Sequence, residues 1–548
     1  MFSSLCDELD VSSTFRYYCE IERAFNTDLY LIRAFCMSKK WMIFYVIILM
    51  YLPVSIDATV LHVAAPRLGI ALSATGSELL WIIDIYSLVM ACLLLPMGAL
   101  GDRIGFKRLA LLGSVLFGMA SLGAALAPSV AALIAARACL AIGAAMILPA
   151  TLSAVRHIFT DERERALALG IWVAIGTMGA AMGPLVGGLL MEYFYWGSVF
   201  LINIPIIIAV VIATLAVIPT QPMRTEQTWK LAPALVLITA ILMLVYAAKT
   251  GLRGNGDPVT TSLTALFGGV MLFVFVRHQL STSAPMIDFR LISQRVIAVG
   301  ITMAMTAMIT LVGFELLLTQ ELQFVLGKSP LEAGIFLLPL MIASGVSGPL
   351  SGWLVARLGL RTVASAGIAF SSLSFLGLAW TDFATQVYLA WGWMILLGFS
   401  IEASLLASTA AIMSAAPPEK AGAAGAVEGM AYELGAGLGV AIFGLMLSRA
   451  YTSSIVLPED LPASLTEQAS ASISETIQVV NNLGGYDALL NSAKLAFSAS
   501  HSLVLGTASG LLILLATVVW FAMPGKKYGN LHIDRRGQLA PQTADKVD

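Results

Sequence analysis

The sequence predicts an all-α polytopic membrane protein, on the basis of its composition, its long apolar segments and the placement of its basic residues. Of the 548 residues, 58% are hydrophobic and 12% are charged, whereas soluble domains carry about 25% charged residues. The net charge of −2 and the lack of a dense basic cluster give no indication of a nucleic-acid partner. The five cysteines form no CxxC pair, so we predict neither a disulfide framework nor a metal site.

Fourteen apolar segments are long enough to cross a membrane. A helix needs about 20 residues to span a hydrocarbon core of roughly 30 Å. We therefore expect spans at 41–65, 78–100, 108–127, 130–150, 166–190, 198–218, 231–249, 259–276, 296–318, 331–353, 361–380, 387–414, 422–448 and 501–523. An even number of spans places both termini on the same side of the membrane.

The distribution of Lys and Arg predicts that this side is the cytoplasm. From Lys39 onward, 21 of the 31 basic residues fall in segments on the side of the termini. Six fall in the opposite loops, namely Arg67, Lys249, Arg253, Lys328, Arg449 and Lys494. Loops rich in Lys and Arg remain in the cytoplasm, so this asymmetry favours two cytoplasmic termini.

Two segments outside the spans need separate interpretation. Residues 1–36 lack the features of a signal peptide, and MSKKW at 37–41 is typical of a protein start. We expect translation to begin at Met37, with a short cytoplasmic extension as the alternative. The outer loop 450–499 contains two weakly amphipathic runs, LPASLTEQASASISETIQVVNN and YDALLNSAKLAFSAS, separated by two glycines. They predict a helical hairpin that either caps the pore mouth or passively connects two spans.

An internal repeat divides the chain. GALGDRIGFK (98–107) aligns with GWLVARLGLR (352–361), and each copy follows the second span of a six-span half. Transporters are commonly built from such repeats. We expect an N-terminal extension at 1–40 and an N-terminal half at 41–218. Two inserted helices with their linkers follow at 219–295. The C-terminal half, which includes the outer loop, covers 296–523, and a cytoplasmic tail covers 524–548.

Several motifs resemble one known family. GALGDRIGFKR is similar to the cytoplasmic loop motif of the major facilitator superfamily, carried here by Gly98, Asp102, Arg103, Gly105, Lys107 and Arg108. SIDATVLHVAAP resembles the first-span motif of the 14-span drug:proton antiporters in that superfamily. GAAMGPLVGG (179–188) matches their fifth-span antiporter motif at Gly179, Gly183, Pro184, Gly187 and Gly188. WIIDIYSLV (81–89) resembles the acid-bearing second span of the exporters of methyl viologen and quaternary ammonium compounds.

The resemblance covers Met37 to about Pro524 and implies the fold of this superfamily, with six, two and six membrane helices and pseudo-twofold halves. It also implies a location in the bacterial inner membrane. The chain departs from the family pattern at two places. Leu140 and Ala141 replace Gln and Gly of the fourth-span motif, and Ser344 stands where a related antiseptic pump has an acid. Divalent-cation handling by that acid is therefore not implied here.

Two acids in the first two spans are the leading candidates for function. A carboxylate at a helix centre costs about 2.5–3.5 kcal/mol to insert, so helices kept only as anchors would lack Asp57 and Asp84. At 1.5 Å per residue, both lie in the outer half of the membrane, and we expect them to face one cavity. Such a pair can hold a proton and release it when a cation arrives. The alternative is that each stays protonated and hydrogen-bonded to a neighbour such as Thr59 or Tyr86.

Further charged candidates lie in later spans. Glu428 and Glu433 are about 140° apart around their helix, so one face cannot present both. We expect at least one of them to face the cavity and prefer Glu428, with pairing inside the bundle as the alternative for Glu433. Arg137 should face the interior and pair with an acid or a backbone carbonyl, because an isolated Arg in lipid is costly. The resemblance implies that it takes part in proton coupling. Glu402 is a further candidate, whereas Glu315 is expected to be interfacial.

Three other features complete the predicted site. The glycines of the fifth-span motif bring two helices close and Pro184 kinks the span, which predicts a tight seam; generic helix packing is the alternative. We expect Asp102, Arg103 and Arg108 to latch neighbouring helices in the short loop. Trp81, Tyr86 and Tyr432 can hold a flat cation against an aromatic ring, although core packing would also place such residues in spans.

Together these features predict a proton-driven multidrug efflux antiporter, not an enzyme. It would export lipophilic cations, such as methyl viologen, quaternary ammonium biocides and cationic dyes, by alternating access. The expected energy source is the proton gradient, without a cofactor, and the chain has no GxxxxGK[ST] motif for a nucleotide. The expected partners are small cations, protons and membrane lipid, and we expect a monomer. The alternatives are a proton-coupled uptake carrier for a small metabolite and a membrane sensor or channel.

Overall fold

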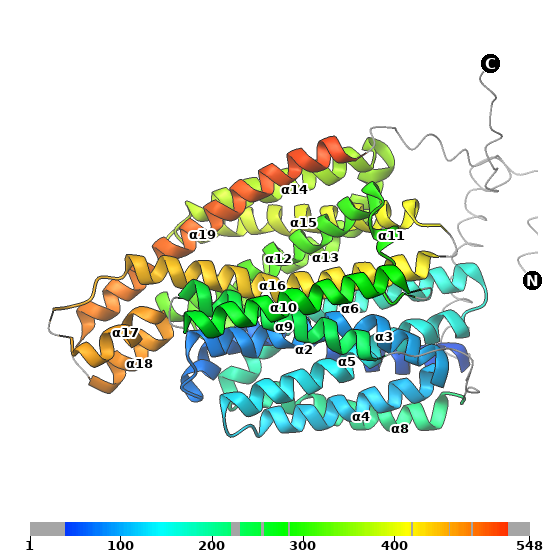
Figure 1. Cartoon of the computed structure of the whole chain (residues 1–548), viewed down its shortest axis with the longest axis horizontal. Helices are drawn as coiled ribbons and strands as arrows, with labels where there is room; N and C mark the ends of the chain where they lie inside the picture. Colours follow the sequence, from blue (N-terminus) through cyan, green and yellow to red (C-terminus); the bar gives the residue numbers. More distant parts are fainter. Residues whose placement is uncertain are drawn as a thin grey trace, which may run out of the picture.

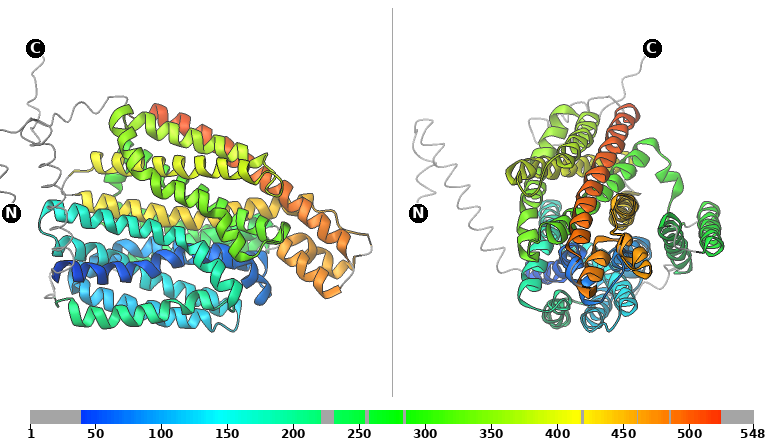
Figure 2. Two further views of the ribbon diagram at one scale, coloured as in Figure 1. Left: turned by 180° about the vertical axis from the view of Figure 1, so that it is seen from behind. Right: turned by 90° about the vertical axis from the view of Figure 1, so that its left-hand side faces the viewer.

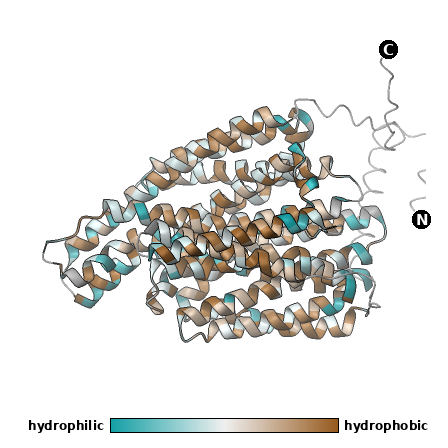
Figure 3. Ribbon diagram, in the orientation of Figure 1, coloured by the Kyte–Doolittle hydropathy of each residue, from teal (hydrophilic) through white to brown (hydrophobic). Residues whose placement is uncertain are grey.

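The computed structural model describes residues 39–220, 231–253, 257–282, 285–417, 420–459, 461–483 and 486–523. The predicted start at Met37 and the tail 524–548 lie outside these ranges. In the described part, fourteen helices are long and apolar enough to cross a membrane, and each overlaps one predicted span. Figure 1 shows them as long rods that lie side by side. Apolar residues dominate these rods in Figure 3, which confirms the predicted fold class.

The spans form two six-span halves with a pair of helices between them. The N-terminal half consists of α2 (Lys39–Ala71), α3 (Gly76–Ile104), α4 (Phe106–Ala125), α5 (Val130–Ile158), α6 (Glu162–Tyr193), and α7 (Ser198–Leu201) with α8 (Asn203–Val217) as one span. The inserted part contains α9 (Ala232–Arg253), α10 (Pro258–Ser281) and the short α11 (Phe289–Ile292). The C-terminal half consists of α12 (Arg295–Gln320) with the π-helix η1 (Glu321–Val325), α13 (Pro330–Leu358), α14 (Leu360–Ala379), α15 (Val387–Ala415), α16 (Ala421–Ser454) and α19 (Asp487–Ala522).

The sequence repeat recurs as a repeat of local structure. α3 begins with a capping box in which the Thr75 and Glu78 side chains satisfy each other's backbone N–H groups. α13 begins with the equivalent box from Ser329 and Glu332. Each helix ends at a glycine with positive φ, 87° at Gly105 and 83° at Gly359, where a side chain would be strained. The loop motif therefore makes the same turn in both halves.

The helix bundle has two distinct ends. At the termini end, α2 begins and α19 finishes, whereas α17 (Ala463–Ala471) and α18 (Ile473–Leu483) project from the hairpin end (Figures 1 and 2). The predicted hairpin of the outer loop is therefore formed by α17 and α18, within the first amphipathic run. The second run also packs against the first, since Val479 of α18 and Leu489 share one apolar cluster, but it forms the first turns of α19 instead of a separate helix. Buried Ala493 and Phe497 join these turns to the core, so the helix continues without a break.

The inserted pair lies against one flank of the bundle. α9 and α10 pack on each other, and α9 also contacts α3 of the N-terminal half and α16 of the C-terminal half. Figure 2 shows the pair beside the two halves in the end-on view. Leu88 of α3, Val245 of α9 and Ala441 of α16 form one small apolar cluster. The inserted helices thus bridge the two halves along one side.

Candidate functional site

A large cavity lies between the two halves. Its volume is about 1450 Å³, and α2, α3, α5 and α6 line it on one side, with α12 and α16 on the other. It extends to the termini end, where its lining includes Asp102, Arg156, His157 and His278. Typical sites for small ligands enclose about 300–1,000 Å³. The cavity therefore has room for a bulky ligand together with water, and it is open toward the termini end.

Glycine contacts close the cavity at the hairpin end. A Cβ atom on Gly188 of α6 would lie 2.6 Å from the Pro330 carbonyl oxygen of α13. Reciprocally, a Cβ on Gly334 of α13 would lie 2.6 Å from the Pro184 carbonyl oxygen. These distances leave no space for a side chain, so the two halves touch backbone to backbone. The fifth-span motif thus includes a close approach of two helices, which belong to different halves.

The rest of that motif packs α6 onto α2 within the N-terminal half. The Thr59 hydroxyl donates a hydrogen bond to the Ala180 carbonyl at 2.7 Å. Cβ atoms on Gly179, Gly183 and Gly187 would lie within 3.0 Å of Ser55, Thr59 and Val60, respectively. Thr59 is therefore engaged with α6 and does not provide the hydrogen bond to Asp57 that was considered as an alternative.

A buried His–Glu pair crosses between the halves next to this closure. His62 Nδ1 of α2 lies 2.8 Å from a carboxylate oxygen of Glu315 on α12. Gln323 of η1 also donates to the Val63 carbonyl at 2.9 Å. The expectation that Glu315 is interfacial was wrong, because its side chain is buried against the opposite half. Our sequence interpretation missed His62, although a titratable ring five residues after Asp57 in an apolar span was a usable signal.

Asp57 and Arg137 form an ion pair in the core of the N-terminal half. Arg137 Nη1 lies 2.5 Å from Asp57 Oδ2, and each residue is 1% exposed. The guanidinium also donates to the Ile82 carbonyl at 3.2 Å and lies 4.5 Å from the centre of the Tyr86 ring. Arg137 thus pairs with both an acid and a backbone carbonyl. These three contacts, with groups on α2 and α3, fix the orientation of the guanidinium.

Asp84 has a different cation, supplied by an inserted helix. Lys249 of α9 donates to Asp84 Oδ2 at 2.6 Å, and both side chains are buried. The same ammonium lies 4.1 Å from the centre of the Trp81 ring, one turn earlier on α3. The placement of Lys249 in an outer loop was wrong, since it lies inside α9. A lysine close to the end of an apolar segment does not reveal from sequence whether it faces water or the bundle.

The two acids do not face one cavity as expected. Asp84 lines the cavity, whereas Asp57 is not among the lining residues. Each acid has its own cation, so the carboxylates are not a pair of like charges sharing a proton. One oxygen of each carboxylate, Oδ1, is buried without a hydrogen bond to the described residues.

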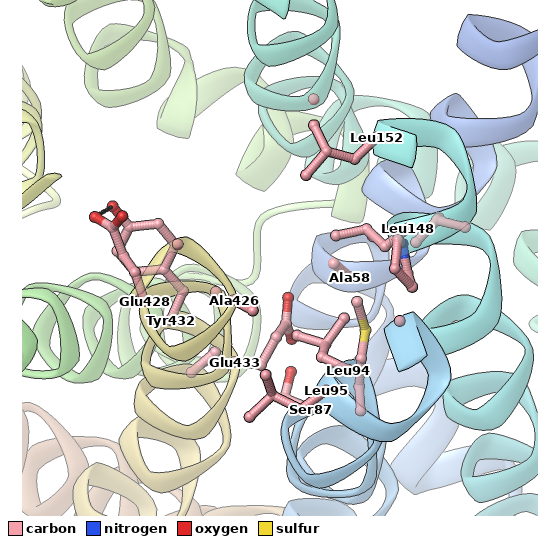
Figure 4. Close-up of a pocket in the computed structure, with 18 of the residues that line it drawn as sticks. Ala58, Ser87, Leu94, Leu95, Leu148, Leu152, Ala426, Glu428, Tyr432 and Glu433 are labelled. Atoms are coloured by element: carbon pink, nitrogen blue, oxygen red, sulfur yellow. Dashed lines mark hydrogen bonds between the residues drawn. The ribbon is translucent and has the colours of Figure 1, made fainter. Parts of the chain in front are cut away.

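The acids of α16 carry hydroxyl partners instead of cations. Thr409 and Tyr432 donate to the same oxygen of Glu428, at 2.5 and 2.8 Å. Among the described residues, neither Glu428 nor Glu433 has an ion pair. Figure 4 shows Glu428 beside Tyr432 on one side of α16, while Glu433 projects toward α3 and Ser87. Both acids line the cavity, which agrees with the expectation that at least one of them faces it; although they lie on different faces of α16, the cavity borders both faces.

Glu402 lies outside the cavity lining. Its carboxylate accepts a hydrogen bond from Ser344 of α13 at 3.1 Å. Ser344 therefore provides a hydroxyl partner to a nearby acid at the position where a related pump carries an acid of its own. The pair ties α13 to α15 within the C-terminal half.

The loop motif after α3 anchors helix ends. Lys107 donates to the Ile218 carbonyl at 2.5 Å and to the Leu215 carbonyl at 3.3 Å, which caps α8. Arg108 donates to the Ile104 carbonyl, and Asp102 is exposed at the cavity mouth. The latch that we expected from Asp102, Arg103 and Arg108 is therefore made by Lys107, between α4 and α8.

Aromatic rings line the cavity near these acids. Tyr86 and Tyr432 are lining residues, and Trp172 of α6 stacks on Tyr51 of α2 at 4.4 Å between ring centres. Trp81 is not a lining residue, and its ring lies under the Lys249 ammonium. In the described part, no group of three or more His, Cys, Asp and Glu side chains has an arrangement suited to a metal ion.

Comparison with known proteins identifies the family. The model of the Major Facilitator Superfamily matches residues 47–440. The chain belongs to the major facilitator superfamily. It is 58% identical over 489 residues to the methyl viologen resistance protein SmvA of Salmonella typhimurium, which covers 89% of this chain and 99% of that protein. It is also 35% identical to the multidrug efflux pump LfrA of Mycolicibacterium smegmatis, over 88% of this chain and 96% of that protein.

Solved members of the major facilitator superfamily share the fold. A bacterial homologue of the human lysosomal transporter Spinster, in an inward-facing and unoccupied conformation, matches with a TM-score of 0.64 at 16% identity. The match covers 89% of this chain and 98% of that one. At this identity, the likeness concerns the fold alone. The family membership and the fourteen candidate spans show a multi-pass membrane transporter.

Proposed function

We propose that this protein is a proton-driven antiporter that exports lipophilic cations from bacteria. The observation that supports this most directly is the cavity, which is accessible from the termini end and contains Glu428 and Glu433 without cationic partners among the described residues. An unpaired carboxylate inside a membrane cavity attracts a cation, and the Tyr432 ring offers an aromatic face for a cation–π contact. The similarity to SmvA supports methyl viologen and related quaternary ammonium compounds as the substrate class.

The proposed orientation places the termini end in the cytoplasm of the inner membrane. Moving Lys249 from the outer loops into α9 leaves five basic residues in those loops, so the Lys and Arg asymmetry becomes stronger. The cavity then opens to the cytoplasm, from which an exporter collects its substrate.

In the proposed cycle, the substrate and the proton use the same carboxylates. A cation enters from the cytoplasm and binds between α3 and α16, with Glu428 and Glu433 ionised. The two halves rock about the site, which opens the glycine seam and separates His62 from Glu315 at the hairpin end. Protons from outside then neutralise the glutamates and release the cation. The return step carries the protons inward, so coupling requires only differential binding in the two states.

An efflux assay tests this function. Cells that produce the protein and are loaded with ethidium or methyl viologen should lose the compound faster than cells with an empty vector. A protonophore should abolish the difference. Export that continues when the proton gradient is collapsed would refute proton coupling, and accumulation in place of export would refute the direction of transport.

A further inference from the structure

Lys249 has no part in the proposed cycle, yet it places a positive charge beside a cavity acid. Intramembrane ionisable residues are expensive and usually functional. Its ammonium contacts Asp84 at 2.6 Å and the Trp81 ring at 4.1 Å. A carboxylate combined with an indole face is the chemistry that recognises organic ammonium ions. The Lys249 ammonium therefore occupies a complete cation site.

The carboxylate end of this site borders the cavity, and the Trp81 ring lies behind it under the lysine. Asp84 and its neighbours Ile83 and Ser87 are lining residues, whereas Lys249 is not and approaches from the flank of the bundle. Asp84 uses only Oδ2 for the lysine, and its Oδ1 has no hydrogen bond to the described residues. A cation in the cavity can thus approach Asp84 through Oδ1, while Lys249 contacts Oδ2.

The geometry of the second buried pair shows what a fixed ion pair looks like. Arg137 contacts Asp57, the Ile82 carbonyl and the Tyr86 ring, and Asp57 is outside the cavity lining. Lys249, by contrast, has a flexible four-carbon stem close to the hairpin end of α9. Side chains with such a stem can carry their ammonium toward the membrane surface, and any displacement of Lys249 from Asp84 requires this movement.

We propose that Lys249 is a tethered competitor for the carboxylate–indole site of Asp84 and Trp81, and that the cationic nitrogen of a substrate displaces it. The inference rests on the proposed export of lipophilic cations. Lys249 keeps Asp84 neutralised while the cavity is empty, and a substrate binds there only when it replaces the ammonium. Because α9 contacts both α3 and α16, release of Lys249 also loosens a bridge between the two halves. The inserted helices thereby determine how strongly a substrate cation must bind in order to displace the lysine.

Binding of tetraphenylphosphonium to purified protein at pH 8 tests the proposal. Lys249→Met removes the competitor, so its affinity should be about tenfold higher than that of the wild type. Asp84→Asn should weaken binding, and adding Lys249→Met to Asp84→Asn should cause no further change, because there is no carboxylate to compete for. Lys420→Met, which removes an exposed lysine outside the cavity lining, is the matched control and should bind as the wild type does.

Two negative results have different meanings. Wild-type protein that does not bind the probe would overturn the proposed function and this inference with it. Wild-type binding that Lys249→Met leaves unchanged or weakens would overturn this inference alone.

A measurement on the wild-type protein decides the case if Lys249→Met fails to fold. Acetylation by acetic anhydride, followed by mass spectrometry of peptides, reports how accessible each lysine is. Saturating tetraphenylphosphonium should raise acetylation of Lys249 at least threefold while that of Lys420 stays constant. Acetylation of Lys249 that is unchanged or reduced by the probe would overturn the displacement.

Discussion

The two halves hold their buried acids in different ways. In the N-terminal half, Asp57 and Asp84 each contact a cation, at 2.5 and 2.6 Å. In the C-terminal half, Glu428 and Glu402 accept hydrogen bonds only from hydroxyl groups of the described residues. Asp57 and Asp84 are thus neutralised by cations of the protein itself, whereas Glu428 and Glu402 have no cationic partner among the described residues. Two other buried acids of the C-terminal half, Glu315 and Glu321, lie against His62 and His501.

This difference arises on a shared framework. α3 and α13 have equivalent capping boxes and equivalent terminal glycines, yet the repeat aligns Asp84 with Leu338 and Trp81 with Ile335. The backbone has kept its symmetry while the side chains in the membrane have diverged. Lys107 and Arg361 occupy equivalent positions of the repeat, and both remain basic although their contacts differ. Lys107 caps α8 through carbonyl groups, and Arg361 lies 4.3 Å from the Trp520 ring of α19.

The largest effect is expected where a fixed pair in the N-terminal half is broken. Asp57→Asn leaves the Arg137 guanidinium buried without its counter-ion, and Arg cannot lose its proton. The free energy of unfolding should fall by about 3–5 kcal/mol. Arg137→Gln should cost less, because the remaining Asp57 can become neutral by binding a proton. Unfolding of the purified variants, followed by tryptophan fluorescence, measures both losses. A greater loss of stability in Arg137→Gln than in Asp57→Asn would contradict the view that an unpaired buried guanidinium costs more than an unpaired carboxyl group.

A smaller loss of stability is expected at the seam where the halves meet. In Gly188→Ala, the new Cβ must push away the Pro330 carbonyl of α13, which lies 2.6 Å from its position. Overpacking of this kind costs about 1–3 kcal/mol and should reduce ethidium export at least tenfold. Gly170→Ala on the same helix is the matched control, because nothing lies within 4 Å of its Cβ position. Equal export by the two variants would show that the seam tolerates separation.

The seam also illustrates what sequence could predict. Glycine spacing and apolar length depend on local chemistry, so the fourteen spans, the repeat and the tight contact at Gly188 were accessible from the residues alone. Partner choice depends on how helices far apart in the sequence are rotated. The pairing of Lys249 with Asp84 and of His62 with Glu315 joins residues 165 and 253 positions apart, and no local pattern encodes such rotations. For the same reason, the separation of Asp57 from the cavity could not be foreseen.

In the C-terminal half, loss of an acid should impair transport rather than stability. Glu428→Gln keeps the size of the side chain and can still accept from Thr409 and Tyr432, so the free energy of unfolding should change by less than about 1 kcal/mol. Ethidium export should nevertheless be lost, because the amide cannot exchange a proton for a cation. Glu402→Gln, in the same half but outside the cavity lining, should retain export. If both variants export at the wild-type rate, the available acids of this half are not the coupling groups.

The smallest effect is expected for an ion pair that has nearly the geometry of Lys249 and Asp84 but lies at the surface. Lys420 donates to Asp288 at 2.7 Å, with about half of the lysine side chain exposed. This hydrogen bond, with help from the backbone N–H groups of α11, lowers the pKa of Asp288 below its ordinary value. Since the pKa is lower in the folded state, the pair stabilises the protein above the unfolded pKa of about 3.9.

That stabilisation is lost as the pH falls through the lower, folded pKa of Asp288. Water screens the pair, so Lys420→Ala should reduce the free energy of unfolding at pH 7 by less than about 1 kcal/mol. The difference from the wild type should shrink in 1 M salt and disappear in strong acid, where Asp288 is protonated in both proteins. Unfolding curves at pH 7, with and without 1 M salt, and in strong acid below the folded pKa of Asp288 measure it. A loss as large as that for Asp57→Asn would show that burial does not determine how much an ion pair matters in this protein.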